Sequence, residues 1–64
     1  MENVQKRIKD YLTEHGIKQG FLAEKLGVTD SIISAMLNGN RNIDCIEYFE
    51  ICRALDVPLE TFFE

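Results

Sequence analysis

The sequence predicts an all-α fold, a five-helix bundle formed by one domain that covers residues 1–64. Apolar side chains recur every three or four positions along five segments, which is the spacing of an amphipathic helix. Glycine, proline and helix-capping residues separate these segments. Runs that alternate between apolar and polar residues, which indicate strands, are absent. A chain of 64 residues is expected to form one small domain.

The first two helices are expected over about residues 3–15 and 18–26, beginning at Asn3 and Lys18. Gly16 and Gly27 follow them, and glycine most readily takes the left-handed conformation that ends a helix. The residues expected to point inward are Val4, Ile8, Tyr11 and Leu12 in the first helix and Leu22, Ala23 and Leu26 in the second.

The third and fourth helices have clear start signals. Thr29 is expected to cap a helix that runs to about Asn38 and ends before Gly39. Asp44 and Glu47 have the spacing of a capping box, in which each side chain accepts a hydrogen bond from the backbone amide of the other. The helix that they begin is expected to carry the apolar stripe Ile46, Phe49, Cys52 and Leu55, its last residue.

A short fifth helix is expected after Pro58, because proline suits the first turn of a helix. It carries Leu59, Phe62 and Phe63. Both cysteines, Cys45 and Cys52, are expected to be buried as small apolar residues. The core is expected to combine Ile8, Leu12, Leu22, Ala23, Leu26, Val28, Ile33, Met36, Phe49, Cys52 and Leu55.

The net charge of −4 is concentrated at one end of the chain. Residues 1–42 hold six basic and five acidic side chains, a net charge of +1. Residues 43–64 hold one basic and six acidic side chains, a net charge of −5. The first two thirds can therefore present a positive face to a phosphate backbone, although not a strongly basic one.

No metal, cofactor or catalytic activity is expected. The two cysteines lie seven residues apart, no CxxC motif is present, and His15 belongs to no cluster of metal-binding residues. His15 has no recognisable nucleophile as a partner, and so short a chain is not expected to form a pocket of ~300 Å³ for a small-molecule ligand. Without an apolar run that suits a membrane span or a signal peptide, the protein is expected in the cytoplasm.

Residues 19–38 have the pattern of two helices that cross steeply at a short turn. Close crossing needs a small side chain on the first helix, which Ala23 supplies, and the sharp turn needs a positive φ, which Gly27 tolerates. Apolar side chains must fill the wedge between the helices, and those in place are Leu22, Leu26, Val28, Ile33 and Met36. This segment predicts a helix-turn-helix.

The segment resembles the helix-turn-helix of the phage repressor and Cro-like (XRE) family. The resemblance extends over about Ile8 to Phe63, through G-I-K-Q before the motif, N-G-N-R-N after it and I-C-R-A-L-D-V-P-L-E-T-F-F at the end. It implies a lambda repressor-like domain that binds duplex DNA sequence-specifically as a transcriptional regulator of the repressor type. In such domains the second motif helix enters the major groove.

The resemblance also implies roles for individual residues. Gln19 is placed to contact phosphate and a base, and Lys18 is placed to help. The side of the recognition helix that faces the groove carries Thr29, Asp30, Ser31 and Ala35, with Ser34 beside them. The loop expected to meet the next phosphates contains Asn38, Asn40, Arg41 and Asn42.

The groove-facing side departs from the family pattern of Gln, Arg or Lys. Asp30, Ser31 and Ala35 cannot make a bidentate contact with guanine or adenine. Asp30 can accept from a cytosine amino group or can act as a charge at a helix N-terminus, and in either role it repels phosphate. Leu37 stands where the family usually has a polar residue. Lys6, Arg7 and Lys9 are interpreted as a solvated face of the first helix.

Two further questions stay open at this level. The alternative function is a protein-interaction module, similar to an antirepressor or an antitoxin, that keeps the fold with weak or lost DNA binding. A weak homodimer is expected through the C-terminal residues Leu59, Phe62 and Phe63, because one short helix cannot bury all three. The alternative is that both rings fold back over Val4 and Ile8 and close the bundle.

Overall fold

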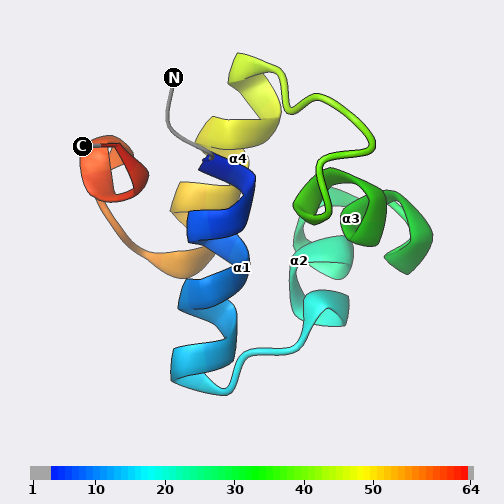
Figure 1. The fold of residues 1–64 in the computed structure, drawn as a ribbon, viewed down its shortest axis with the longest axis horizontal. Coiled ribbons are helices and arrows are strands. Elements are labelled where there is room, and N and C mark those ends of the chain that lie inside the picture. The colour runs from blue at the N-terminus through cyan, green and yellow to red at the C-terminus, as the bar shows by residue number, and fades with distance from the viewer. Residues whose placement is uncertain (1–3, 64) are drawn as a thin grey trace.

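The computed structural model describes residues 4–63, and it confirms the all-α prediction (Figure 1). No strand is present between residues 4 and 63. The elements are α1 Val4–His15, α2 Gln19–Leu26, α3 Asp30–Leu37, α4 Cys45–Leu55 and the short 3-10 helix η1 Leu59–Phe62. The expected first residue of the first helix, Asn3, lies outside the described residues.

The expected fifth α-helix is instead one turn of 3-10 helix. The amide of Thr61 donates to the carbonyl of Pro58, and the amide of Phe63 donates to the carbonyl of Glu60. Both bonds span three residues, as in a 3-10 helix. The bundle therefore has four α-helices and one 3-10 turn among the described residues.

The helix ends follow the local signals in the sequence. Gly16, Gly27 and Gly39 all have positive φ, as predicted for residues that end helices. Asp56 ends α4 in the same left-handed conformation, with φ 58, which aspartate tolerates better than most residues.

The predicted caps are present. Thr29 Oγ1 accepts a hydrogen bond from the amide of Ile32 at 3.3 Å. Asp44 Oδ1 accepts from the amide of Glu47 at 2.8 Å, and Glu47 Oε1 accepts from the amide of Asp44 at 3.1 Å. This capping box fixes the start of α4.

Most of the predicted core is confirmed, and the errors concentrate on α4. The buried residues are Ile8, Leu12, Leu22, Ala23, Ile33, Met36, Leu37, Ile51, Cys52 and Phe62, while Leu26, Val28 and Leu55 are half-buried against them. Phe49 was expected in the core but is 46 % exposed, and Ile46 of the same stripe is 68 % exposed. Cys45 is also exposed, contrary to expectation.

The physical reason is that α4 has more apolar residues than one helix face can bury. Ile46 and Phe49 lie on one face, and Tyr48, Ile51, Cys52 and Leu55 lie on another with equally good helical spacing. The second face packs inward, so the stripe expected from spacing is half right: Cys52 and Leu55 lie on the inward side, whereas Ile46 and Phe49 do not.

Two helices, α1 and α2, each pack against two other elements. α2 packs against α3 and α4, and α1 packs against α3 and η1 (Figure 1). The ring of Phe62 on η1 meets Tyr11 and Tyr48 edge to face, with centroids 5.6 and 6.3 Å away. Phe62 is 2 % exposed, so its ring is not available for the expected dimer interface; it packs inside the bundle on Tyr11 and Tyr48, whereas the alternative had both rings over Val4 and Ile8.

Candidate nucleic-acid interface

The turn between α2 and α3 has the geometry that the motif requires. Ala23 is buried, and its carbonyl accepts a hydrogen bond from the amide of Val28 at 3.0 Å. Gly27, with φ 71, reverses the chain between them. A larger side chain at residue 23 would separate the two helices, so this residue and the turn together set their crossing.

α3 has a buried face and a polar outer face. Ile33, Met36 and Leu37 are buried. The exposed residues at the start of the helix are Thr29, Asp30 and Ser31, while Ser34 and Ala35 are half-buried next to them. The structure therefore brings the predicted groove-facing residues to one surface. Leu37, which departs from the family pattern, packs in the core.

The Asp30 carboxylate lies beside the first turn of α2. A methyl group built on Gly20 would lie 3.6 Å from Asp30 Oδ1 and 3.8 Å from Oδ2. The positive end of the α2 dipole favours a negative charge near this turn. Asp30 is also the acidic residue in the first turn of its own helix, α3, and its role as a terminal charge or in contact with a base stays a prediction.

The start of α2 and the loop after α3 are both open to solvent. Lys18 occupies the N-cap position of α2 without a side-chain cap, and Gln19 is half-buried. In the loop, Asn40, Arg41 and Asn42 are exposed. Arg41 pairs with Glu47 of α4, with 3.0 Å between Arg41 Nη1 and Glu47 Oε2.

Lys9 is a candidate that sequence reasoning missed. Its Nζ donates a hydrogen bond to Asn38 Oδ1 at 2.8 Å, and Asn38 Nδ2 donates to Ser34 Oγ at 3.3 Å. Lys9 was interpreted as part of a solvated face of α1. The apolar stripe of α1 indicated that Lys9 points away from the core, but not that this side of α1 meets the end of α3.

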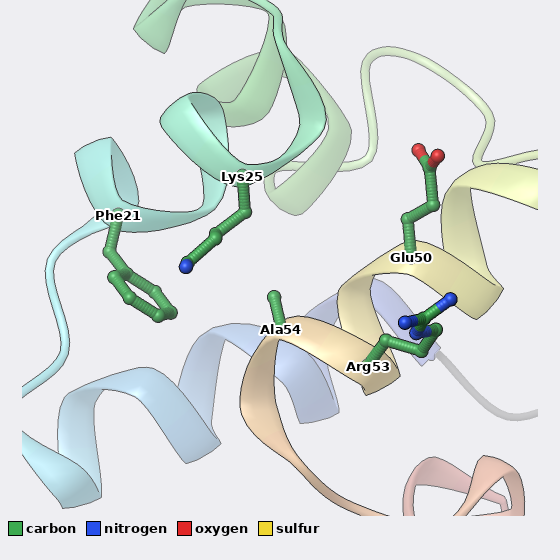
Figure 2. A pocket seen from close by; sticks show the side chains of 5 residues that line it. All are labelled: Phe21, Lys25, Glu50, Arg53 and Ala54. Carbon is green, nitrogen blue, oxygen red and sulfur yellow. The ribbon is translucent and has the colours of Figure 1, made fainter.

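The side of α2 that faces α4 is hollowed. Figure 2 shows a depression between α2 and α4, with Phe21 and Lys25 on the α2 side and Ala54 on the α4 side. Glu50 and Arg53, also on α4, complete its lining. Lys25 Nζ lies 5.5 Å from the centre of the Phe21 ring. The volume is about 380 Å³, and a neighbouring depression of about 610 Å³ shares Phe21 and Ala54. Both depressions are open to solvent, so the expectation that the chain forms no pocket able to bury a small-molecule ligand stays a prediction.

These depressions hold side chains of mixed charge next to a phenyl ring. Among residues 4–63 no group of three or more His, Cys, Asp or Glu side chains is placed to hold a metal ion. No helix within the described part of the chain has the length and apolar character needed to cross a lipid bilayer.

The sequence model of a family described as Helix-turn-helix matches residues 8–62, which is most of the chain. No curated protein and no solved structure matches.

Proposed function

Since the chain belongs to the Cro/C1-type (XRE) family of helix-turn-helix proteins, a family of DNA-binding regulators, we propose that it is a sequence-specific repressor that binds duplex DNA. The observation that carries the proposal is the polar outer face of α3. That face lies next to the open start of α2 and to Asn38, at the beginning of the loop that carries Arg41. In this arrangement α3 enters the major groove and the flanking groups meet the two phosphate backbones.

The candidate contacts divide into two kinds. Ser31 and Ala35 are placed to meet base edges, Ser31 through its hydroxyl and Ala35 through contact with a thymine methyl group. Thr29 contributes less to base contact, because its hydroxyl oxygen already accepts from the amide of Ile32. The residues that we assign to phosphate are Lys9, Lys18, Gln19, Asn38, Asn40, Arg41 and Asn42. Ser34, bonded to Asn38, supports them from α3.

This set of contacts predicts modest affinity. It contains few cations and no Arg or Gln on the groove-facing side of α3, while Asp30 adds a negative charge there. Binding is therefore expected to be weak at physiological salt and to fall steeply as salt rises, because phosphate contacts release counterions.

Titration of fluorescent duplexes at several salt concentrations tests the proposal. Gln19→Ala and Arg41→Ala should weaken binding to all sequences, because phosphate contacts position the protein without specifying the site. Ser31→Ala should mainly relax the preference at one base pair of a site selected from random duplexes. If neither the wild type nor Asp30→Asn binds any duplex at low salt, the proposal is wrong.

We also propose that two copies pair weakly on DNA, since one recognition helix covers only a few base pairs. Leu59 and Phe63, which are 48 % and 46 % exposed, are the C-terminal residues available for such a contact. In this role the protein acts in the cytoplasm and uses no cofactor, small-molecule ligand or catalytic activity.

A second candidate function is a protein-interaction module similar to an antirepressor or an antitoxin. The observation that favours it is the number of large apolar side chains on the surface of so small a domain. Phe21, Ile46 and Phe49 are exposed in addition to the two C-terminal residues. Absence of duplex binding in the titrations above would make this candidate the better one.

A further inference from the structure

The carboxylate of Glu47 joins the loop after α3 to the first turn of α4. Its Oε2 lies 3.0 Å from Arg41 Nη1, and its Oε1 accepts a hydrogen bond from the amide of Asp44 at 3.1 Å. The backbone of Glu47 is held as well, because its amide donates to Asp44 Oδ1 at 2.8 Å. Glu47 is thus fixed at both ends by the capping box.

The two members of the ion pair differ in freedom. The Glu47 side chain is 18 % exposed, whereas the Arg41 side chain is 42 % exposed and lies in the loop. The Arg41 side chain can rotate away from Glu47, whereas the Glu47 side chain can move only if its hydrogen bond to the Asp44 amide, part of the α4 cap, breaks. Arg41 is also the one basic residue between Asn38 and Glu47 in the sequence.

We infer that Glu47 restrains duplex binding by competing with DNA phosphate for the guanidinium of Arg41, an inference that rests on the proposed function. A phosphate that reaches Arg41 in its observed position must approach the fixed carboxylate, which repels it. A phosphate that draws Arg41 away must break the ion pair. Glu47 therefore sets part of the affinity and of the salt dependence, although it contacts no DNA itself.

The restraint is expected to be modest because the pair is partly open to water. Exposed ion pairs contribute little, and solvent screens the repulsion between the carboxylate and a phosphate. We expect removal of the Glu47 charge to tighten duplex binding about three- to tenfold at low salt. The slope of log K against log salt should steepen by up to about 0.9, the value for one phosphate that Arg41 neutralises fully instead of in part.

The variant that tests the inference is Glu47→Gln. The amide oxygen of glutamine can still accept from the amide of Asp44, so the capping box is kept while the charge is removed. Glu50→Gln is the matched control, because it removes the same charge from the next turn of α4, where Glu50 lines the depression toward Phe21. Both variants are titrated with the same random-sequence duplex across a range of salt.

The expected result is tighter binding by Glu47→Gln than by Glu50→Gln, with the difference lost when Arg41→Ala is added to both. Equal or weaker binding by Glu47→Gln overturns the inference while the proposed function stands. If the wild type and every variant fail to bind any duplex at low salt, the proposed function itself is wrong and the inference falls with it.

A measurement on the wild-type protein keeps the test valid if Glu47→Gln does not fold. NMR signals of the Arg41 guanidinium should shift when duplex is added, because the pair opens. The backbone amide of Asp44, which reports on its bond to Glu47 Oε1, should shift much less. Unchanged Arg41 signals in a titration that shifts the amides of α3 would also overturn the inference.

Discussion

Lys9 on α1 donates a hydrogen bond from Nζ to Asn38 Oδ1, 2.8 Å away at the end of α3. This contact joins residues that are 29 positions apart in the sequence and brings a cation to the end of the proposed recognition helix. Lys6 lies on the same side, where it forms an ion pair with Asp10. The phosphate-binding surface that we propose therefore includes α1 as well as the helix-turn-helix.

Lys9→Gln should weaken binding to all duplexes without changing sequence preference. If Lys9 meets one phosphate, the slope of log K against log salt should become shallower by about 0.9. The control is Arg53→Gln, which removes one positive charge from α4, where Arg53 lies 5.7 Å from the Phe49 ring centre. Equal effects of the two substitutions would show that only the total charge matters.

Asp30→Asn should raise the affinity for non-specific duplex. The substitution removes a negative charge from the first turn of α3, beside Gly20 in the first turn of α2, where phosphate is expected to bind. Asp56→Asn is the matched control, because asparagine tolerates the left-handed conformation of this residue at the far end of α4. Anisotropy titrations that show no gain for Asp30→Asn over Asp56→Asn would contradict the position assigned to Asp30.

Ala23→Leu should destabilise the fold by about 1–3 kcal/mol, because the larger side chain forces α2 and α3 apart. Ala23 is buried, and its carbonyl is bonded to the amide of Val28. Ala54→Leu is the comparison, since Ala54 borders the depression of about 380 Å³ and a larger side chain has room there. Urea denaturation should separate the two variants, and equal midpoints would refute the packing described for Ala23.

The free energy of unfolding should fall as the pH rises above about 9. Burial raises the pKa of the Cys52 thiol above its usual 9.0. Burial, together with the neighbouring Cys52, raises the pKa of Tyr48 from 10.0 to about 12. In this alkaline range the unfolded chain releases these protons before the folded chain does, so deprotonation favours unfolding.

Urea denaturation between about pH 7 and pH 11 measures this dependence. Tyr48→Phe should make the fall in stability shallower above about pH 10, because the hydroxyl that titrates is gone. The variant also loses the hydrogen bond from the Tyr48 hydroxyl to the carbonyl of Leu59, so the comparison is of slopes and not of absolute stability. A slope that does not change would contradict the assignment.

Self-association, if it uses the C-terminal segment, should be weak and should depend on Phe63. The ring is 46 % exposed and stacks on Tyr48 with centroids 5.3 Å apart. Phe63→Ser should reduce dimerisation, while Phe49→Ser, at an equally exposed ring on α4, should not. High salt should strengthen the dimer, because it screens the acidic residues near the C-terminus.

Sedimentation equilibrium at high protein concentration, in low and in high salt, measures this association. A monomer under both conditions rejects the dimer. A dimer that Phe63→Ser leaves intact, or that Phe49→Ser weakens as much, places the interface elsewhere.

Much of the helical framework was determined by the sequence itself, because its signals are local. A glycine at positive φ ends a helix through its own backbone conformation and does not depend on distant residues. Gly16, Gly27 and Gly39 therefore marked three helix ends correctly. The capping box of Asp44 and Glu47 needs only residues three apart. The motif over residues 19–38 was predictable for the same reason, since Ala23 and the turn meet within one short segment.

Only the tertiary structure decided which of several equivalent faces is buried and which distant residues meet. Helical spacing allowed either Phe49 or Ile51 in the core, and packing against the other helices chose Ile51. It also placed Phe62 inside, joined Lys9 to Asn38 and set Arg41 against Glu47. These outcomes depend on how elements far apart in the chain pack together. The spacing of residues within one helix holds no information about which other element that helix will pack against.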